Sequence, residues 1–215
     1  NWSWTQEVAK AKLITSGDIY APSGTVVHNW RTEFGLGAYT PINFALSTAG
    51  TKVLLKNELA LQGVRNGLQN GGRVTGIVYL CSTSFFNAYV THNSVEAAYA
   101  NWTNAQDPIR SRVGTPVNSL NRTFQWGGII LQEVSDLAPD GTPLIPDGEA
   151  YAVPMGTDIF KMFYGPREAF SALNKAAERM YMLRSGDDTK VEIYTESNFA
   201  AACMSPNAIQ KLVIS

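Results

Sequence analysis

The sequence is poor in cysteine and histidine, and this scarcity excludes several classes of protein. Cys81 and Cys203 are the only cysteines among 215 residues, which is too few for a disulfide framework. Both stand beside apolar residues, so we expect buried free thiols. The two histidines, His28 and His92, have no second histidine and no cysteine at metal-ligand spacing. We interpret both as structural residues, with a ligand or general base as the less favoured alternative.

Charge and long apolar runs are also sparse. The 17 basic and 18 acidic residues give a formal net charge of −1, and no basic stripe offers the electrostatic footprint of nucleic-acid binding. No apolar run approaches the roughly 20 residues that a membrane span needs, and the first residues do not resemble a secretion signal. With 45% hydrophobic residues, the chain predicts a packed core in one large or two small domains.

Familiar catalytic fingerprints are missing. There is no G-x-S-x-G elbow, no phosphate-binding loop and no dinucleotide fingerprint. Four acidic residues nevertheless gather within residues 135–149 and could bind Ca²⁺ or supply a glycosidase pair: Asp136, Asp140, Asp147 and Glu149. Their spacing does not match a calcium loop, and the prolines between them indicate a surface loop. We favour a solvated or subunit-facing loop, and a hydrolase that uses this loop is the alternative.

The tryptophans could in principle form a stacking platform for sugars or bases. They are widely scattered, and no lysine or arginine is interleaved with them. We therefore interpret them as core or interface residues: Trp2, Trp4, Trp30, Trp102 and Trp126.

The first half of the chain predicts helices around one central strand. Residues 2–13 have the apolar spacing of a helix, which should end near Gly17 because glycine suits the position just past a helix end. Thr51–Leu68 predicts a second, amphipathic helix. Val74–Leu80 is apolar without alternation, which is typical of a central strand covered on both faces. The hydroxyls of residues 82–84 can cap a following helix.

The second half predicts strands. Ser119–Trp126 alternates between apolar and polar residues, which indicates a half-buried strand. Gly127 and Gly128 allow a bulge or a close backbone approach, after which Ile129–Val134 continues the strand. Further strands are expected over Ala150–Met155, Lys190–Met204 and Ile209–Ile214.

The order of these pieces resembles the lambda-type phage major capsid proteins, the protein E family. The resemblance is carried by the aromatic-glycine strand Phe124–Gly128, the turn-rich segment Leu144–Pro154 and the closing segment Ser197–Ile209. Earlier in the chain, Ala9–Gly17 resembles the end of the family's spine helix. Val78–Phe86 is similar to the strand-to-helix step of its axial domain.

This resemblance implies an α+β chain with the Hong Kong 97-type capsid fold. Residues 1–48 and 180–215 would form the peripheral domain with the end of the spine helix, and residues 49–179 the axial domain. The chain starts without Met inside a helical pattern. We therefore expect a processed or truncated species that lacks the family's N-terminal arm and extended loop.

The implied function is structural. The chain would be a major head protein of a tailed phage or prophage, assembling with copies of itself into pentamers and hexamers of an icosahedral shell. Scaffolding, portal or decoration proteins are further candidate partners, and the shell would enclose DNA without sequence-specific binding. We expect no enzymatic activity, no cofactor and no membrane partner. The protein would occur in the host cytoplasm during assembly and then in the virion capsid.

The resemblance also suggests where subunits meet. The loop of residues 135–147 would lie near the capsomer centre, with Asp136, Asp140 and Gly141 as candidate subunit contacts. An exposed strand edge or apolar patch is expected where a neighbour lies. Beside the hydrolase, a phage tail or adaptor protein that binds partners without forming a shell is the other alternative.

Overall fold

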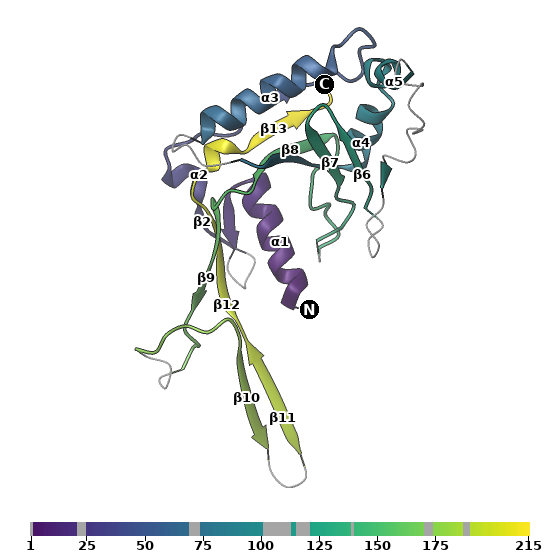
Figure 1. Cartoon of the computed structure of the whole chain (residues 1–215). Helices are drawn as coiled ribbons and strands as arrows, with labels where there is room; N and C mark the ends of the chain where they lie inside the picture. The colour runs from purple at the N-terminus through teal and green to yellow at the C-terminus, as the bar shows by residue number, and fades with distance from the viewer. Residues whose placement is uncertain are drawn as a thin grey trace.

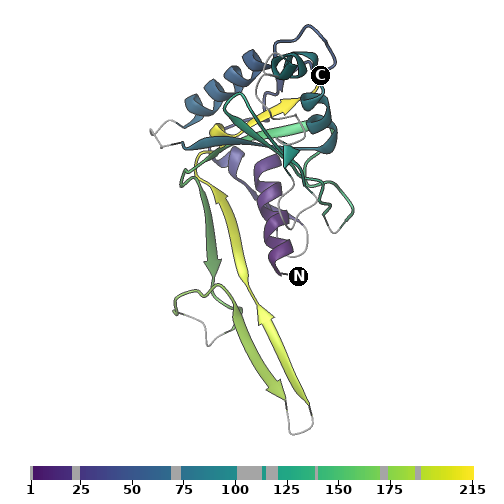
Figure 2. The same cartoon turned by 45° about the vertical axis from the view of Figure 1, so that its right-hand side comes forward.

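The molecule consists of a broad sheet covered by helices and a narrow ribbon that projects from it (Figure 1). The computed structural model describes residues 2–20, 25–68, 74–100, 113–114, 121–138, 140–169, 174–186 and 190–215. Turning the molecule shows that the ribbon remains a long arm, with the first helix beside its upper part (Figure 2).

Seven strands form the broad sheet. In their order across the sheet they are β3 (Ile42–Asn43), β13 (Gln210–Val213), β8 (Glu149–Met155), β4 (Gly76–Cys81), β7 (Ile129–Glu133), β6 (Thr123–Trp126) and β5 (Val113–Gly114). The central strand β4 runs parallel to β7 and antiparallel to β8, and four of its six residues are buried. The prediction of a central strand over this apolar run is confirmed. β3 and β13 join this sheet from the two ends of the sequence.

Three helices accompany the sheet: α3 (Val53–Gly67), α4 (Thr83–Val90) and α5 (Asn93–Ala100). We call them, together with the seven strands, the sheet layer. α3 buries Val53, Ala60 and Val64, which lie on one helical face. At the start of α4, the backbone N–H of Phe85 donates to the Ser82 hydroxyl at 3.4 Å. The predicted amphipathic helix and the predicted cap are both present.

The core of the sheet layer is an aromatic cluster. Neighbouring rings lie with centroids between 5.7 and 6.5 Å apart in edge-on, tilted and stacked arrangements. Its members come from β4, α4, β6 and the residue that follows β3, so the cluster connects α4 to the sheet: Phe44, Tyr79, Phe85, Tyr89 and Phe124.

The turn between β6 and β7 corrects the prediction of one bulged strand through Ser119–Val134. Trp126 pairs with Ile129, so the two glycines form a two-residue hairpin turn. Their φ angles are +62° at Gly127 and +79° at Gly128. Positive φ at both positions gives a turn whose twist matches the strands that flank it, and glycine adopts it without strain. Residues 119–120 of that prediction lie outside the described residues.

The N-terminal part supplies a helix and a small antiparallel pair. α1 (Trp2–Thr15) ends at Gly17, whose φ is +79°, as the sequence predicts. β1 (Asp18–Tyr20) then pairs with β2 (Val26–Asn29). A short helix that the sequence pattern did not reveal, α2 (Trp30–Glu33), follows directly and is capped by the side chain of Asn29.

The ribbon consists of two antiparallel pairs placed end to end (Figures 1 and 2). β9 (Phe160–Gly165) pairs with β12 (Asn198–Cys203), and β10 (Tyr181–Gly186) pairs with β11 (Val191–Glu196). The prediction of one strand over Lys190–Met204 is wrong in this respect, because the strand breaks at Ser197 and changes its partner there. We call β10 and β11 the hairpin.

Candidate interaction surfaces

Two acidic residues of the predicted contact loop are exposed and locally bonded. Asp136 accepts from the Asn121 amide at 3.1 Å. Asp140 accepts from the Thr142 hydroxyl at 2.6 Å and from its backbone N–H at 3.0 Å. Both hydrogen bonds lower the pKa of the Asp140 carboxyl, and the bond from the Thr142 hydroxyl has the larger effect. Gly141 is exposed beside it with a φ of +80°. The three candidate contact residues therefore shape an exposed turn.

The other two acidic residues face different partners. Asp147 accepts from the Ser84 hydroxyl at the start of α4. Glu149 lies 2.5 Å from the Lys211 ammonium and accepts from the Tyr151 hydroxyl at 2.7 Å. Throughout the described part of the chain, no group of histidine, cysteine and acidic side chains is arranged to hold a metal ion. Only Asp140 therefore stabilises its own turn, and the other three carboxylates bind side chains of neighbouring segments.

Both histidines have packing roles. His92 is buried, and its Nδ1 accepts from the backbone N–H of Ser94 at 3.2 Å, where α5 begins. Its Nε2 lies 3.1 Å from the Thr48 carbonyl oxygen, which fixes it as the donor. His28 lies 3.6 Å from the Glu33 carboxylate and meets the Trp30 ring edge-on.

The two thiols are free and buried, as predicted. Burial raises the pKa of Cys81 well above its usual range and that of Cys203 to about 11. Both side chains stay protonated near neutral pH and therefore have little nucleophilic character.

Of the tryptophans, Trp30 and Trp126 pack against the core. The Trp30 indole also donates to the Ala201 carbonyl in β12 at 3.2 Å. The side chains of Trp2 and Trp4 and the whole of Trp102 lie outside the described part. The core interpretation therefore holds for the two tryptophans that the structure places in this way.

The hairpin carries apolar side chains on both faces. Met182, Val191 and Ile193 share one face, and Leu183 and Tyr194 share the other. Met182 is 66% exposed and Ile193 63% exposed. We call these five residues the hairpin patch. Soluble proteins seldom leave such a group uncovered, so the hairpin patch is a candidate contact surface.

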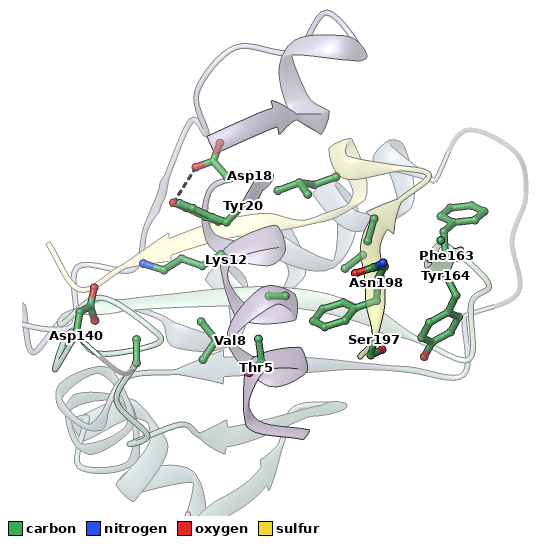
Figure 3. Close-up of a pocket in the computed structure, with 17 residues that line it drawn as sticks. Thr5, Val8, Lys12, Asp18, Tyr20, Asp140, Phe163, Tyr164, Ser197 and Asn198 are labelled. Atoms are coloured by element: carbon green, nitrogen blue, oxygen red, sulfur yellow. Dashed lines mark hydrogen bonds between the residues drawn. The ribbon is translucent and has the colours of Figure 1, made fainter. Parts of the chain in front are cut away.

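A groove of about 1080 Å³ lies between α1, β1, the ribbon and the contact loop (Figure 3). Apolar side chains such as Val8 and Phe199 line it, and Asp18 lies among them within 3.5 Å of the Tyr20 hydroxyl. Lys12 extends from α1 toward Asp140 (Figure 3). Sequence reasoning missed this groove, because its walls come from segments far apart in the chain and no local pattern joins them.

The outer face of α3 is a third apolar surface. Leu54, Leu55 and Leu59 are each about half exposed there. Among the described helices, none is long and apolar enough to cross a membrane.

Known proteins resemble this chain over nearly its whole length. Residues 3–214 match the family model described as phage major capsid protein E. The chain is 29% identical to the major capsid protein of Pseudomonas phage KPP10, over 96% of this chain and 63% of that protein.

A solved structure shows the same fold at low sequence identity. This is a protein described as a capsid protein of a prophage in E. coli CFT073, with a TM-score of 0.56 at 12% identity. The match covers 97% of this chain and 62% of that one. The chain thus spans somewhat less than two thirds of the length of both relatives, and its mixture of helices and strands is that of a phage capsid structure.

Proposed function

Because this chain belongs to the phage major capsid protein E family, we propose that it builds a phage or prophage head by joining copies of itself into pentamers and hexamers. The family consists of structural capsid proteins and not of enzymes, so the hydrolase alternative falls. Rings of five and six arise when one surface of a subunit binds a different surface of the next and the rotation closes.

The finer description of the fold belongs to the same proposal. We assign the Hong Kong 97-type fold, with a peripheral domain of residues 1–48 and 180–215 and an axial domain of residues 49–179. The likeness to the prophage capsid structure supports the fold. The proposed domain bounds do not coincide with the ribbon and the sheet layer, because β9 of the ribbon falls within residues 49–179 and β3 and β13 of the sheet fall within the peripheral segments. Scaffolding, portal or decoration proteins would be further partners. Assembly would take place in the host cytoplasm, and the shell would enclose DNA without sequence-specific binding.

The observation that carries the proposal is the hairpin patch. Its five side chains lie on both faces of a two-stranded element, and no sheet or helix among the described residues covers them. An isolated hairpin of this kind is marginally stable in water. Contact with neighbouring copies would remove its apolar surface from solvent, and this supplies the driving force for association.

The direct test is assembly of the full gene product, followed by electron microscopy. Uniform shells or capsomers are expected from the natural sequence. Met182→Ser combined with Ile193→Ser should abolish or strongly reduce them. Val27→Ser is the matched control, because Val27 is an equally exposed apolar residue on a strand outside the hairpin. A stable monomer with hydrolytic turnover, or normal shells from the double variant, would contradict the proposal.

We propose the contact loop as a second subunit contact, near the capsomer centre. Asp136, Asp140 and Gly141 are all exposed, which leaves them free to meet a neighbour. Asp136→Trp should disturb ring formation and leave the fold intact, as measured by circular dichroism and by particle counts. Asp158→Trp is the control, since Asp158 is another exposed aspartate that lies outside this loop. Equal particle yields from the two variants would remove the loop from the set of contacts.

A further inference from the structure

The ribbon meets the sheet layer at a junction where two chain segments cross. Residues 156–159 lead from β8 into β9, and residues 204–209 lead from β12 into β13 through the short helix η2 (Pro206–Ala208). Two connecting strands alone would let the ribbon swing, because relative motion of two parts is expected unless their contact is extensive. The angle of the ribbon therefore depends on what holds η2.

One side of η2 is held by the backbone of α3. A Cβ placed on Gly67 would lie 2.3 Å from the Asn207 carbonyl oxygen and 2.6 Å from the Cα of Ala208. A Cβ on Gly63 would lie 2.9 Å from the side chain of Gln210. Only glycine permits so close an approach, so α3 and η2 are in direct backbone contact.

A second contact with η2 is made by Arg31 of α2. Its Nη1 donates to the Pro206 carbonyl at 3.3 Å, and its Nε and Nη2 donate to the Gly37 carbonyl at 3.0 and 2.8 Å. The guanidinium carbon lies 3.7 Å above the centre of the Tyr39 ring. Arg31 is only 9% exposed, and the three hydrogen bonds named above go to carbonyl oxygens.

The residues around Arg31 also make contacts with α1 and with the ribbon. The Tyr39 hydroxyl donates to the Ile14 carbonyl near the end of α1 at 2.9 Å. The Trp30 backbone N–H donates to the Gly17 carbonyl at 2.8 Å, and its indole reaches β12. A Cβ on Gly17 would come within 2.9 Å of the Arg31 side chain. Arg31 and its immediate neighbours therefore connect α1, β12 and η2.

We propose that Arg31 is a positioning residue that fixes the angle between the ribbon and the sheet layer, and through this angle sets the curvature of the assembled shell. The role of Arg31 in fixing the angle rests on the geometry alone, whereas its effect on the curvature of the shell rests on the proposed function. The hairpin patch lies on the ribbon, whereas the α3 leucines lie on the sheet layer. If neighbours bind both, the direction of one relative to the other determines how sharply adjacent subunits tilt.

Arginine suits this position for a reason that lysine does not share. Its planar guanidinium presents five donors in a fixed fork and can stack on an aromatic ring at the same time. A lysine ammonium is a compact point charge and would not hold the Gly37 and Pro206 carbonyls in one plane above Tyr39. Arg31→Lys therefore keeps the charge and loses the geometry.

The angle can be measured with a pair of spin labels. Leu55→Cys on α3 and Phe163→Cys on β9 place the labels at exposed sites on the two sides of the junction. The native thiols are buried and should remain unlabelled. Pulsed electron paramagnetic resonance on the full gene product, diluted with unlabelled protein, should give one narrow distance distribution. Arg31→Met should broaden and shift it, and Arg31→Lys should do so to a smaller degree.

Arg122→Met is the matched control. It removes a partly buried arginine whose partner Glu133 lies in the sheet layer, far from η2 in the chain, so it lowers stability without touching the junction. Its distance distribution should be that of the natural sequence. A narrow, unshifted distribution in Arg31→Met would overturn the proposal. If Arg31→Met does not fold, Arg31→Lys decides by the same criterion.

Electron microscopy then tests the curvature. Arg31→Lys should give particles of altered or mixed diameter, whereas Arg122→Met particles should keep one diameter at reduced yield. Broadened distances with unchanged particle diameters would overturn the link to curvature. Failure of the natural sequence to form particles would instead count against the proposed function, and the distance measurement would still judge the junction.

Discussion

The sheet layer and the ribbon differ in how far their apolar side chains are removed from water. In the sheet layer, aromatic side chains from several elements pack against one another and are fully buried, as Phe44 and Tyr79 are. In the hairpin, Met182 and Ile193 project into solvent from a ribbon two strands wide. The sheet layer is therefore stabilised by its own chain, whereas the apolar side chains of the hairpin are left for the contact that we propose with another chain.

A rough energy scale supports this contrast. Burying one large apolar side chain contributes about 1.5–3 kcal/mol. The free energy of burying the whole hairpin patch is therefore comparable to the total stability of many domains. This free energy is gained only when the hairpin patch is buried by association. The same substitution should therefore act on folding in the sheet layer and on assembly in the ribbon.

The largest effect on folding is expected inside the sheet layer. Phe44→Ala should lower the free energy of unfolding by about 3–5 kcal/mol, because it leaves a cavity in the aromatic cluster. Chemical denaturation measures the change. Val27→Ala, on an exposed strand, should change it by less than about 0.5 kcal/mol. Similar losses for the two variants would deny that the cluster is the core.

The next effect is expected at the boundary between the two regions. Gly67→Ala should lower the free energy of unfolding by roughly 1–3 kcal/mol, since the added methyl group collides with the backbone of η2. Gly50→Ala is the control, because nothing lies within 4 Å of a Cβ at that position. Thermal unfolding monitored by circular dichroism distinguishes them, and equal melting temperatures would show that α3 and η2 are not in close contact.

A smaller effect, with a clear pH dependence, is expected for the Arg122–Glu133 pair. The hydrogen bond from Arg122 lowers the pKa of the buried Glu133 carboxyl, and the two side chains lie 2.7 Å apart. Arg122→Met should cost about 1–2 kcal/mol at pH 7, discounted because the guanidinium is partly exposed.

The sign of the pH dependence follows from the lowered pKa. The pair contributes stability above the unfolded pKa of about 4.3 and loses it as pH falls through the folded pKa of Glu133. The difference in stability between the natural sequence and Arg122→Met should therefore shrink below about pH 4. A difference that stays constant from neutral to acidic pH would contradict this account.

The smallest effect on folding is expected in the hairpin. Ile193→Ser should change the free energy of unfolding of the unassembled protein by less than about 0.5 kcal/mol, because the side chain is already in water. Chemical denaturation at a protein concentration below that of assembly measures it. A loss as large as that of Phe44→Ala would show that the hairpin packs against its own chain, and the contrast drawn above would be wrong.

The sequence was most informative where a local pattern decides the structure. α1 ends at Gly17 because glycine accepts the positive φ there, and β4 is central because its apolar run leaves no polar face. The sequence was least informative where the structure depends on a partner segment that is distant in the chain. The break at Ser197 depends on which strand lies alongside, β9 or β10, and nothing within the strand itself specifies that choice.

The same distinction between local patterns and distant contacts applies to the candidate functional residues. The acidic loop was recognisable as a surface loop from its prolines and glycines, and the structure shows its three candidate residues exposed. Arg31 was not recognisable, because a charged residue on a short helix is usually solvated. Its burial comes from the Gly37 and Pro206 carbonyls, one of which lies 175 residues away along the chain. No periodicity encodes such a contact.

The place of β13 has a consequence for synthesis on the ribosome. β13 lies between β3 and β8, so the sheet has a gap in it until residues 210–213 have been translated. The hairpin patch precedes these residues in the chain and is exposed first. A nascent chain halted before Gln210 would leave one edge of β8 unpaired, so the sheet reaches its full strand order only after residues 210–213 have been translated.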